Sequence, residues 1–205
     1  MRALILVDLQ YDFMPGGALA VPRGDETIAI ANRLLPHFSL VAATQDWHPR
    51  DHKSFAANHP GRQPYEMIDL HGILQVLWPV HCVQNTHGAE LHAGIDRSRV
   101  TEVFHKGTDP ELDSYSGFFD NDKRKATGLG EWLRERWISR VYVMGLATDY
   151  CVKATALDAR GLGFDVWLIE DGCRGVELKP GDADRAINEM RGAGVAVVES
   201  GSIGP

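Results

Sequence analysis

The chain has 205 residues, of which 44% are hydrophobic and 24% are charged. This size and apolar content suffice for one buried core, and no low-complexity linker divides the chain, so we expect a single domain over residues 1–205. The formal net charge of −7 argues against nucleic acids and anionic membrane surfaces as partners, because both bind basic patches, and favours a small molecule.

No apolar run approaches the roughly 18 residues of a membrane span. The first ten residues, MRALILVDLQ, are interrupted by Asp8 and have the pattern of a strand rather than of a signal peptide. Three cysteines, at positions 82, 151 and 173, lack the spacing of a disulfide framework. We therefore expect free thiols and a cytoplasmic location. No heptad pattern or long amphipathic edge marks an interface, so the sequence leaves both a monomer and a homo-oligomer open.

The first half of the chain alternates strand and helix patterns. Residues 3–8 (ALILVD) form an apolar run that ends in an acid, which is typical of a strand buried on both faces. After a turn-rich loop, Asp25 can cap a helix with apolar residues on one face. These apolar residues are Ile28, Ala31, Leu34, Leu35 and Phe38. A second strand is predicted over residues 40–45, and a long excursion with only short helical turns over residues 51–98.

The second half of the chain continues the alternation. Strands are predicted over residues 100–105, 141–144, 164–169 and 195–198. Helices are predicted around an apolar face of Leu129, Trp132, Leu133 and Trp137, from Val152 to Arg160 with Gly161 at the end, and over residues 183–191 with Asp182 as the cap. Alternating strands and helices imply βαβ units. The expected fold is α/β: a Rossmann-like, three-layer αβα sandwich around a mostly parallel sheet of about six strands.

Polar residues follow four of the predicted strands. Asp8 ends the first strand, Asp46 and His48 follow the second, Lys106 follows the third, and Cys151 comes after the fourth. In open parallel sheets, ligands bind beyond the carboxyl ends of the strands. We therefore expect these side chains to converge in one cleft.

Cys151 follows a predicted strand and a tight turn at Gly145, and stands at the start of a predicted helix. The helix dipole and free backbone N–H groups at such a position stabilise a thiolate. A single cysteine in an apolar region is more often an inert core residue, but its shared position with two other strand ends favours a nucleophile. Lys106 would then stabilise the thiolate, and Asp8 would take and return a proton. The backbone N–H groups of Ala147 and Cys151 can hold a developing oxyanion.

A second set of residues, Asp46, His48 and His81, offers one carboxylate and two imidazoles. This set suits one divalent metal ion, Zn²⁺ above all, although Fe²⁺ and Mn²⁺ accept the same ligands. An isolated Asp-x-His sequence is more often a hydrogen-bonded loop. His52 is a further candidate, either as a weaker ligand or as a group beside the metal.

Aromatic residues gather in the same predicted loops. They are Phe13, Trp47, Trp78, Tyr115 and, beside the cysteine, Tyr150. Flat rings suit a flat heteroaromatic substrate, although aromatic residues in loops are more often part of a loop core.

Short motifs extend over nearly the whole chain. They include LVDLQ-x-DF at 6–13, QDWHP at 45–49, WPVHCVQ at 78–84, FHKG at 104–107, DSYSGFFDN at 113–121, MGLATDYCVK at 144–153 and DGCRGV at 171–176. Together these motifs resemble those of the nicotinamidases (pyrazinamidases) among the isochorismatase-like cysteine hydrolases. QDWHP combined with WPVHC is the most specific part of the resemblance.

The resemblance implies a function and a set of site residues. The implied reaction is hydrolysis of nicotinamide to nicotinate and ammonia through a cysteine thioester, as part of NAD salvage, with pyrazinamide as a further substrate. The implied residues are a catalytic triad of Asp8, Lys106 and Cys151, a metal site of Asp46, His48 and His81, and a ring pocket of Phe13, Trp78, Tyr115, Leu146 and Tyr150. A cis peptide bond is expected between Leu146 and Ala147.

Two other classes of protein stay in view. An amidohydrolase of the same superfamily that acts on another small amide or carbamoyl compound would keep the triad, but it would have no use for a metal that anchors a ring. A non-catalytic small-molecule binding protein on the same fold would lack one member of the triad, and here Asp8, Lys106 and Cys151 are all present.

Overall fold

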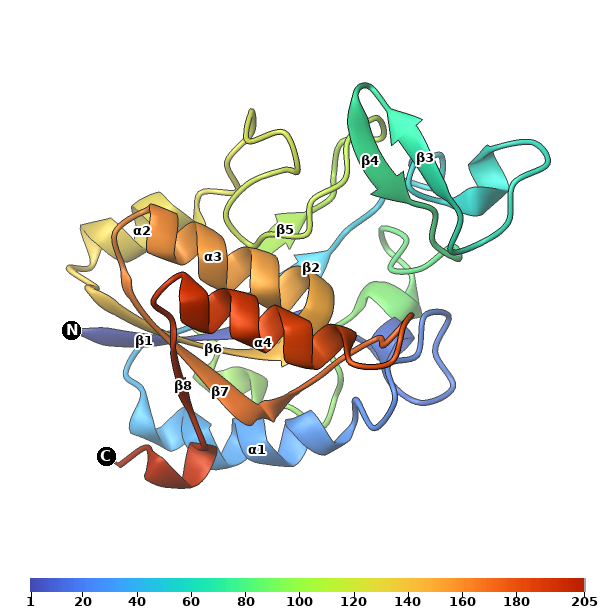
Figure 1. The fold of residues 1–205 in the computed structure, drawn as a ribbon. Helices are drawn as coiled ribbons and strands as arrows, with labels where there is room; N and C mark the ends of the chain where they lie inside the picture. The colour runs from blue at the N-terminus through green and yellow to red at the C-terminus, as the bar shows by residue number, and fades with distance from the viewer. Residues whose placement is uncertain (205) are drawn as a thin grey trace.

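The computed structural model describes residues 1–204, which contain a six-stranded sheet with the strand order β5-β2-β1-β6-β7-β8 (Figure 1). The strands are β1 Arg2–Val7, β2 Val41–Asp46, β5 Glu102–Lys106, β6 Arg140–Leu146, β7 Asp165–Arg174 and β8 Ala196–Val198. Every neighbouring pair runs parallel. The predicted α/β fold with a parallel sheet of about six strands is confirmed.

The apolar run at the N-terminus forms the central strand β1. Residues 3–7 are completely buried, because the strand pairs with β2 on one side and β6 on the other and is covered on both faces. The backbone of Asp8, with φ of 50°, leaves the extended region and ends the strand. The Asp8 side chain therefore lies at the carboxyl edge of the sheet, where it is buried.

Helices cover both faces of the sheet (Figure 1). The helices are α1 Glu26–Leu34 on one face, and α2 Leu129–Glu135, α3 Lys153–Gly161 and α4 Asp182–Gly192 on the other. The predicted apolar face of α1 is buried, and its last two residues, Leu35 and Phe38, belong to the turn that follows the helix. None of the helices in residues 1–204 has the length and apolarity needed to cross a membrane.

Several details of the helix ends differ from the prediction. Asp25 precedes α1 but makes no capping hydrogen bond with its side chain. The residue before α4 is Gly181 in a left-handed conformation, so Asp182 lies in the first turn rather than at the cap. Trp137 is not on the buried face of α2: the helix ends two residues earlier, and the Trp137 side chain is 83% exposed.

The excursion between β2 and β5 contains one structure that periodicity did not predict. Strands β3 Met67–Leu70 and β4 Ile73–Val76 form an antiparallel hairpin that stands apart from the main sheet (Figure 1). His71 and Gly72 make its turn, both with positive φ. The rest contains the expected short helical turns, among them Ala56–Asn58 and His87–Ala89. Each hairpin strand has only four residues, too few for a clear alternating pattern.

Gly145 lies within β6 rather than at the predicted turn, and a side chain there would collide with the backbone of β1. We expect Gly145→Ala to lower the free energy of unfolding by about 3 kcal/mol or more. A Cβ atom there would lie 2.1 Å from the Val7 carbonyl oxygen, and the φ of 128° is one that side chains other than glycine rarely adopt. Denaturant unfolding measures the change.

The matched control is Gly161→Ala at the end of α3, where an added Cβ meets no atom within 4 Å. This variant should change the free energy of unfolding by no more than about 1 kcal/mol, in the stabilising direction. Equal denaturation midpoints for Gly145→Ala and Gly161→Ala would contradict the predicted collision between a side chain at position 145 and β1.

Candidate active site and metal centre

Four chain-distant residues meet at the carboxyl edge of the sheet. Asp8 follows β1, Asp46 and Lys106 are the last residues of β2 and β5, and Cys151 follows β6. Asp46 and Lys106 are paired in the register of the two strands. All four side chains are buried. The structure thus brings together the strand-end residues that the sequence analysis selected.

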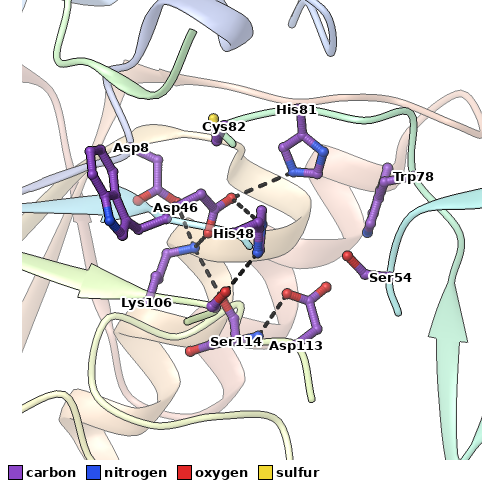
Figure 2. A network of polar contacts seen from close by, with 12 residues as sticks. Asp8, Asp46, His48, Ser54, Trp78, His81, Cys82, Lys106, Asp113 and Ser114 are labelled. Carbon is purple, nitrogen blue, oxygen red and sulfur yellow. Dashed lines mark hydrogen bonds and ion pairs between the residues drawn. The ribbon is translucent and has the colours of Figure 1, made fainter. Parts of the chain in front are cut away.

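The Lys106 ammonium contacts the other three members of this group, and Figure 2 shows it beside Asp8 and Asp46. Its Nζ is 2.9 Å from Asp8 Oδ2 and pairs with Asp46 Oδ1. It also donates to the Ser114 carbonyl at 3.0 Å and to Cys151 Sγ at 3.3 Å. Burial lowers the pKa of Lys106, but the two carboxylates outweigh it and raise the pKa well above its ordinary value. The amine therefore stays charged.

Asp8 is the member of the group that can hold a proton. Its Oδ1 accepts a hydrogen bond from Thr44 Oγ1 at 2.6 Å, and its Oδ2 faces Lys106. Burial raises the pKa of Asp8, and the nearby Asp46 adds to this, although Lys106 opposes it. A carboxyl group with a raised pKa can accept a proton and release it again during a reaction.

Cys151 does not stand at the start of an α-helix as predicted. It lies in a π-helical turn, Thr148–Val152, and α3 begins only at Lys153. Burial raises the pKa of the Cys151 thiol well above its ordinary value, and Lys106 does not overcome this effect. The direction of this shift opposes the predicted thiolate, so the thiol proton has to pass to a base. One oxygen of Asp8 and the Cys151 sulfur lie within 4.8 Å of one another.

Asp46 also faces two imidazoles (Figure 2). Its Oδ2 lies 3.7 Å from Nε2 of His48 and 3.7 Å from Nε2 of His81. The opposite nitrogen of each ring, Nδ1, donates to a backbone carbonyl, at 2.9 Å to Gly107 and at 2.8 Å to Pro79. In the neutral form of each ring, Nε2 is then unprotonated and turned toward one carboxylate, which is how metal-binding imidazoles are usually held. The three residues fit a divalent ion.

The glycine of the FHKG motif makes room for one of these rings. A Cβ atom on Gly107 would lie 2.3 Å from His48 Cε1, and the backbone φ is 62°. A larger residue would therefore displace His48 and lose its hydrogen bond to the Gly107 carbonyl.

His52 is close to this set but differs from it in its hydrogen bonds. Its Nδ1 accepts from the Ser54 backbone N–H at 3.1 Å, so the proton of the neutral ring is on Nε2. Burial lowers the pKa of His52 to about 4, which keeps the ring neutral. Nε2 is buried and has no hydrogen-bond partner within residues 1–204. In this tautomer His52 is a hydrogen-bond donor beside the metal set, and one of its ring nitrogens also lies within 4.8 Å of ligand atoms of His48 and Asp113.

A cavity opens over the thiol. It is lined by four predicted ring-pocket residues, Phe13, Trp78, Tyr115 and Tyr150, by Ala147 and Cys151, by the three metal-site residues, and by Leu19, Asp113 and Val176. Leu146 is buried outside this lining, although the expected cis peptide bond between Leu146 and Ala147 is present. Trp47 also lies elsewhere, stacked on His105 with ring centroids 4.4 Å apart.

Two polar side chains support the site and were not selected from the sequence. Gln10 clamps the end of β2: its Oε1 accepts from the Asp46 N–H and its Nε2 donates to the Asp46 carbonyl, both at 2.8 Å. Gln10 is part of the LVDLQ motif, and this was the signal in the sequence that could have identified it. Gln75, on the hairpin, donates to Asp113 at 3.0 Å and to the Tyr115 hydroxyl at 3.1 Å. No signal pointed to Gln75, because the hairpin itself was not predicted.

Comparison with known proteins gives consistent matches. The isochorismatase domain matches residues 2–202. The nicotinamidase of Escherichia coli (strain K12) is 53% identical over 200 residues, which cover 96% of this chain and 93% of the relative. A solved Acinetobacter baumannii nicotinamidase/pyrazinamidase has a TM-score of 0.95 at 47% identity and covers 98% of this chain and 96% of its own. A Pyrococcus horikoshii pyrazinamidase in complex with zinc has a TM-score of 0.79 at 42% identity, with coverage of 97% and 98%.

The two buried histidines should differ in a metal-binding test. We expect His48→Ala to reduce the bound divalent metal from about one ion per chain to less than about 0.2, because a three-residue set loses one ligand. His52→Ala should keep about one ion per chain, because its Nε2 carries the proton. Elemental analysis of the purified proteins measures both. If His52→Ala lost its metal as completely as His48→Ala, His52 would be a ligand.

Proposed function

The chain belongs to the isochorismatase family, and on that premise we propose that it is a nicotinamidase, which hydrolyses nicotinamide to nicotinate and ammonia and also accepts pyrazinamide. One observation carries the proposal. Asp8 and Lys106 surround the Cys151 thiol at a cavity with aromatic walls, and the same cavity is lined by the three residues suited to a metal. A thiol with its own acid and base, beside a site that can anchor a ring nitrogen, suits an aromatic amide.

In the first half of the reaction, Cys151 sulfur attacks the carboxamide carbon and its proton passes to Asp8. The developing oxyanion is held by the backbone N–H groups of Ala147 and Cys151. Asp8 then gives the proton to the departing nitrogen, so ammonia leaves and a thioester remains. The charged Lys106 stabilises the thiolate as it forms and holds Asp8 in place. Asp8 enters this step as a carboxylate. The raised pKa values of Asp8 and Cys151 suit the transfer, because burial favours the protonated form of each group and the carboxylate readily accepts the proton that leaves the thiol.

In the second half, water attacks the thioester carbon. Asp8 takes a proton from that water, the same N–H groups hold the oxyanion, and the carbon–sulfur bond breaks to release nicotinic acid, which loses its proton to solvent to become nicotinate. The proton returns from Asp8 to the Cys151 sulfur. The cycle consumes one water and leaves the enzyme unchanged.

Asp46, His48 and His81 would hold one divalent ion, with Zn²⁺ the leading candidate and Fe²⁺ or Mn²⁺ the alternatives. When bound, the ion supplies a Lewis-acid contact for the pyridine nitrogen of the substrate. Phe13, Trp78, Tyr115 and Tyr150 flank the ring, which aligns the carboxamide with the thiol. The zinc in the related Pyrococcus horikoshii pyrazinamidase supports this assignment.

We further place the reaction in the salvage of NAD, in the cytoplasm. Nicotinamide is released when NAD is consumed, and its conversion to nicotinate returns the ring to synthesis. Three free, buried thiols suit a reducing compartment.

The nucleophile is tested by comparing two buried cysteines. Cys151→Ala should lower ammonia release from nicotinamide by at least about a thousandfold, because no thioester can form. Cys173→Ala removes an equally buried sulfur from β7, outside the cavity lining, and should keep activity within about threefold of the unchanged enzyme. Substantial turnover by Cys151→Ala, with the protein folded and still binding metal, would reject the nucleophile assignment.

Removal of the metal tests the ring anchor. Chelation should reduce turnover of nicotinamide and of pyrazinamide by at least about tenfold, and added Zn²⁺ should restore it. Aliphatic amides assayed in parallel supply the comparison. A chelated enzyme with full activity, or one that prefers aliphatic amides or carbamoyl compounds, would instead belong with the other amidohydrolases of the superfamily.

A further inference from the structure

The carboxylate of Asp149 bonds to a distant loop. Asp149 lies in the π-helical turn two residues before Cys151 and is buried. Its Oδ1 accepts the backbone N–H of Val176 and its Oδ2 accepts that of Glu177, each at 2.9 Å. An aspartate in the first turn of a helix ordinarily bonds to N–H groups of that helix. Here both oxygens are used on consecutive N–H groups that lie 27 and 28 residues further along the chain.

The loop held in this way forms one wall of the substrate cavity. Val176 lines the cavity together with Tyr150 and Cys151 of the π-helical turn. The loop connects β7, which ends at Arg174, to α4, which begins at Asp182, and it contains no helix or strand of its own. The Asp149 carboxylate therefore fixes the distance between a wall residue and the turn that carries the nucleophile.

The far side of the same loop is anchored separately. The Glu177 carboxylate accepts the N–H groups of Gly181 at 2.7 Å and of Ala183 at 2.9 Å, which satisfies the first turn of α4. Glu177 itself has a φ of 57°. Asp149 and α4 thus hold the loop from two sides, and Val176 lies on the side that Asp149 controls.

We propose that Asp149 is a positioning residue: it acts through Val176 to keep the cavity narrow enough to hold a flat ring above the thiol. The inference rests on the proposed function and adds a determinant of substrate affinity that makes no contact with the reacting atoms. Its signature is a change in KM without a matching change in kcat, because the triad is untouched.

Asp171 offers a matched control. Its carboxylate accepts the backbone N–H of Ser200 at 2.7 Å and the Ser200 hydroxyl, so it also ties two distant segments with two hydrogen bonds. These bonds join β7 to the C-terminal turn, and Asp171 does not line the cavity. Asp171→Asn weakens a comparable pair of hydrogen bonds, and these bonds do not involve the loop that carries Val176.

The test uses the metal-loaded full chain with the variants Asp149→Asn, Val176→Ala, their combination, and Asp171→Asn. Asp149→Asn should raise KM for nicotinamide about tenfold and leave kcat within about threefold. Val176→Ala should raise KM similarly, and adding Asp149→Asn to it should have little further effect, because the two changes act on one contact. Asp171→Asn should leave KM unchanged. Additive effects in the combined variant, or an equal KM rise in Asp171→Asn, would overturn the proposal.

A second readout does not depend on nicotinamide. The rate at which iodoacetamide modifies Cys151, followed by mass spectrometry, should rise at least about threefold in Asp149→Asn and stay unchanged in Asp171→Asn, because only the former opens the wall. If the unchanged enzyme failed to hydrolyse nicotinamide, the proposed function would fall while this rate still tested the role of Asp149. Asp149→Glu keeps both acceptor oxygens but lengthens the side chain, so it should fold and raise both KM and the modification rate. Unaltered values in that folded variant would overturn the proposal.

Discussion

The site depends on one buried cation. Burying the Lys106 ammonium is costly unless it is paired, and here it is held by Asp8 on one side and by Asp46 on the other. Asp46 gives one oxygen to the ammonium and turns the other toward the two imidazoles, so a single carboxylate belongs to both the catalytic set and the metal set. Two carboxylates around one ammonium leave an excess negative charge in a dry environment. A divalent ion on the imidazole side would offset that excess, so the two halves of the site stabilise each other.

The strand order makes this pairing available. Strands β5, β2, β1 and β6 are consecutive neighbours in the sheet, and adjacent strands lie about 4.8 Å apart. Side chains from the ends of four strands can therefore touch, although their positions in the chain span more than half its length. The polar machinery rests on the rigid edge of the sheet. The loops contribute the cavity walls, where Asp149 and Gln75 hold Val176 and Tyr115 in place.

What could be predicted from the sequence follows from the same physics. The ALILVD run predicted β1 because a strand buried on both faces has to be continuously apolar, and the acids and cations after such runs marked the site. The predicted ionisation of Cys151 depended on a helix dipole, which can be inferred from local sequence, whereas the burial that raises its pKa depends on the whole fold. Val176 and the hairpin were missed for a related reason. Hydrogen bonds between distant residues produce no periodic pattern in the sequence, and strands of four residues are too short to show one. Trp137 was misplaced because the helix ends two residues sooner than its apolar pattern suggested.

The position of β1 in the sheet has a consequence for biosynthesis. β1 is made before the other strands, yet one of its two neighbours, β6, begins only at Arg140. The nascent chain therefore carries an unpaired, mostly apolar strand edge while the residues between β1 and β6 are translated. Such an edge can pair with other chains. The arrangement that brings Cys151 beside Asp8 therefore delays completion of the site until late in synthesis. During that interval the ribosome-bound chain depends on β2, and on any chaperone that covers apolar strands, to remain soluble.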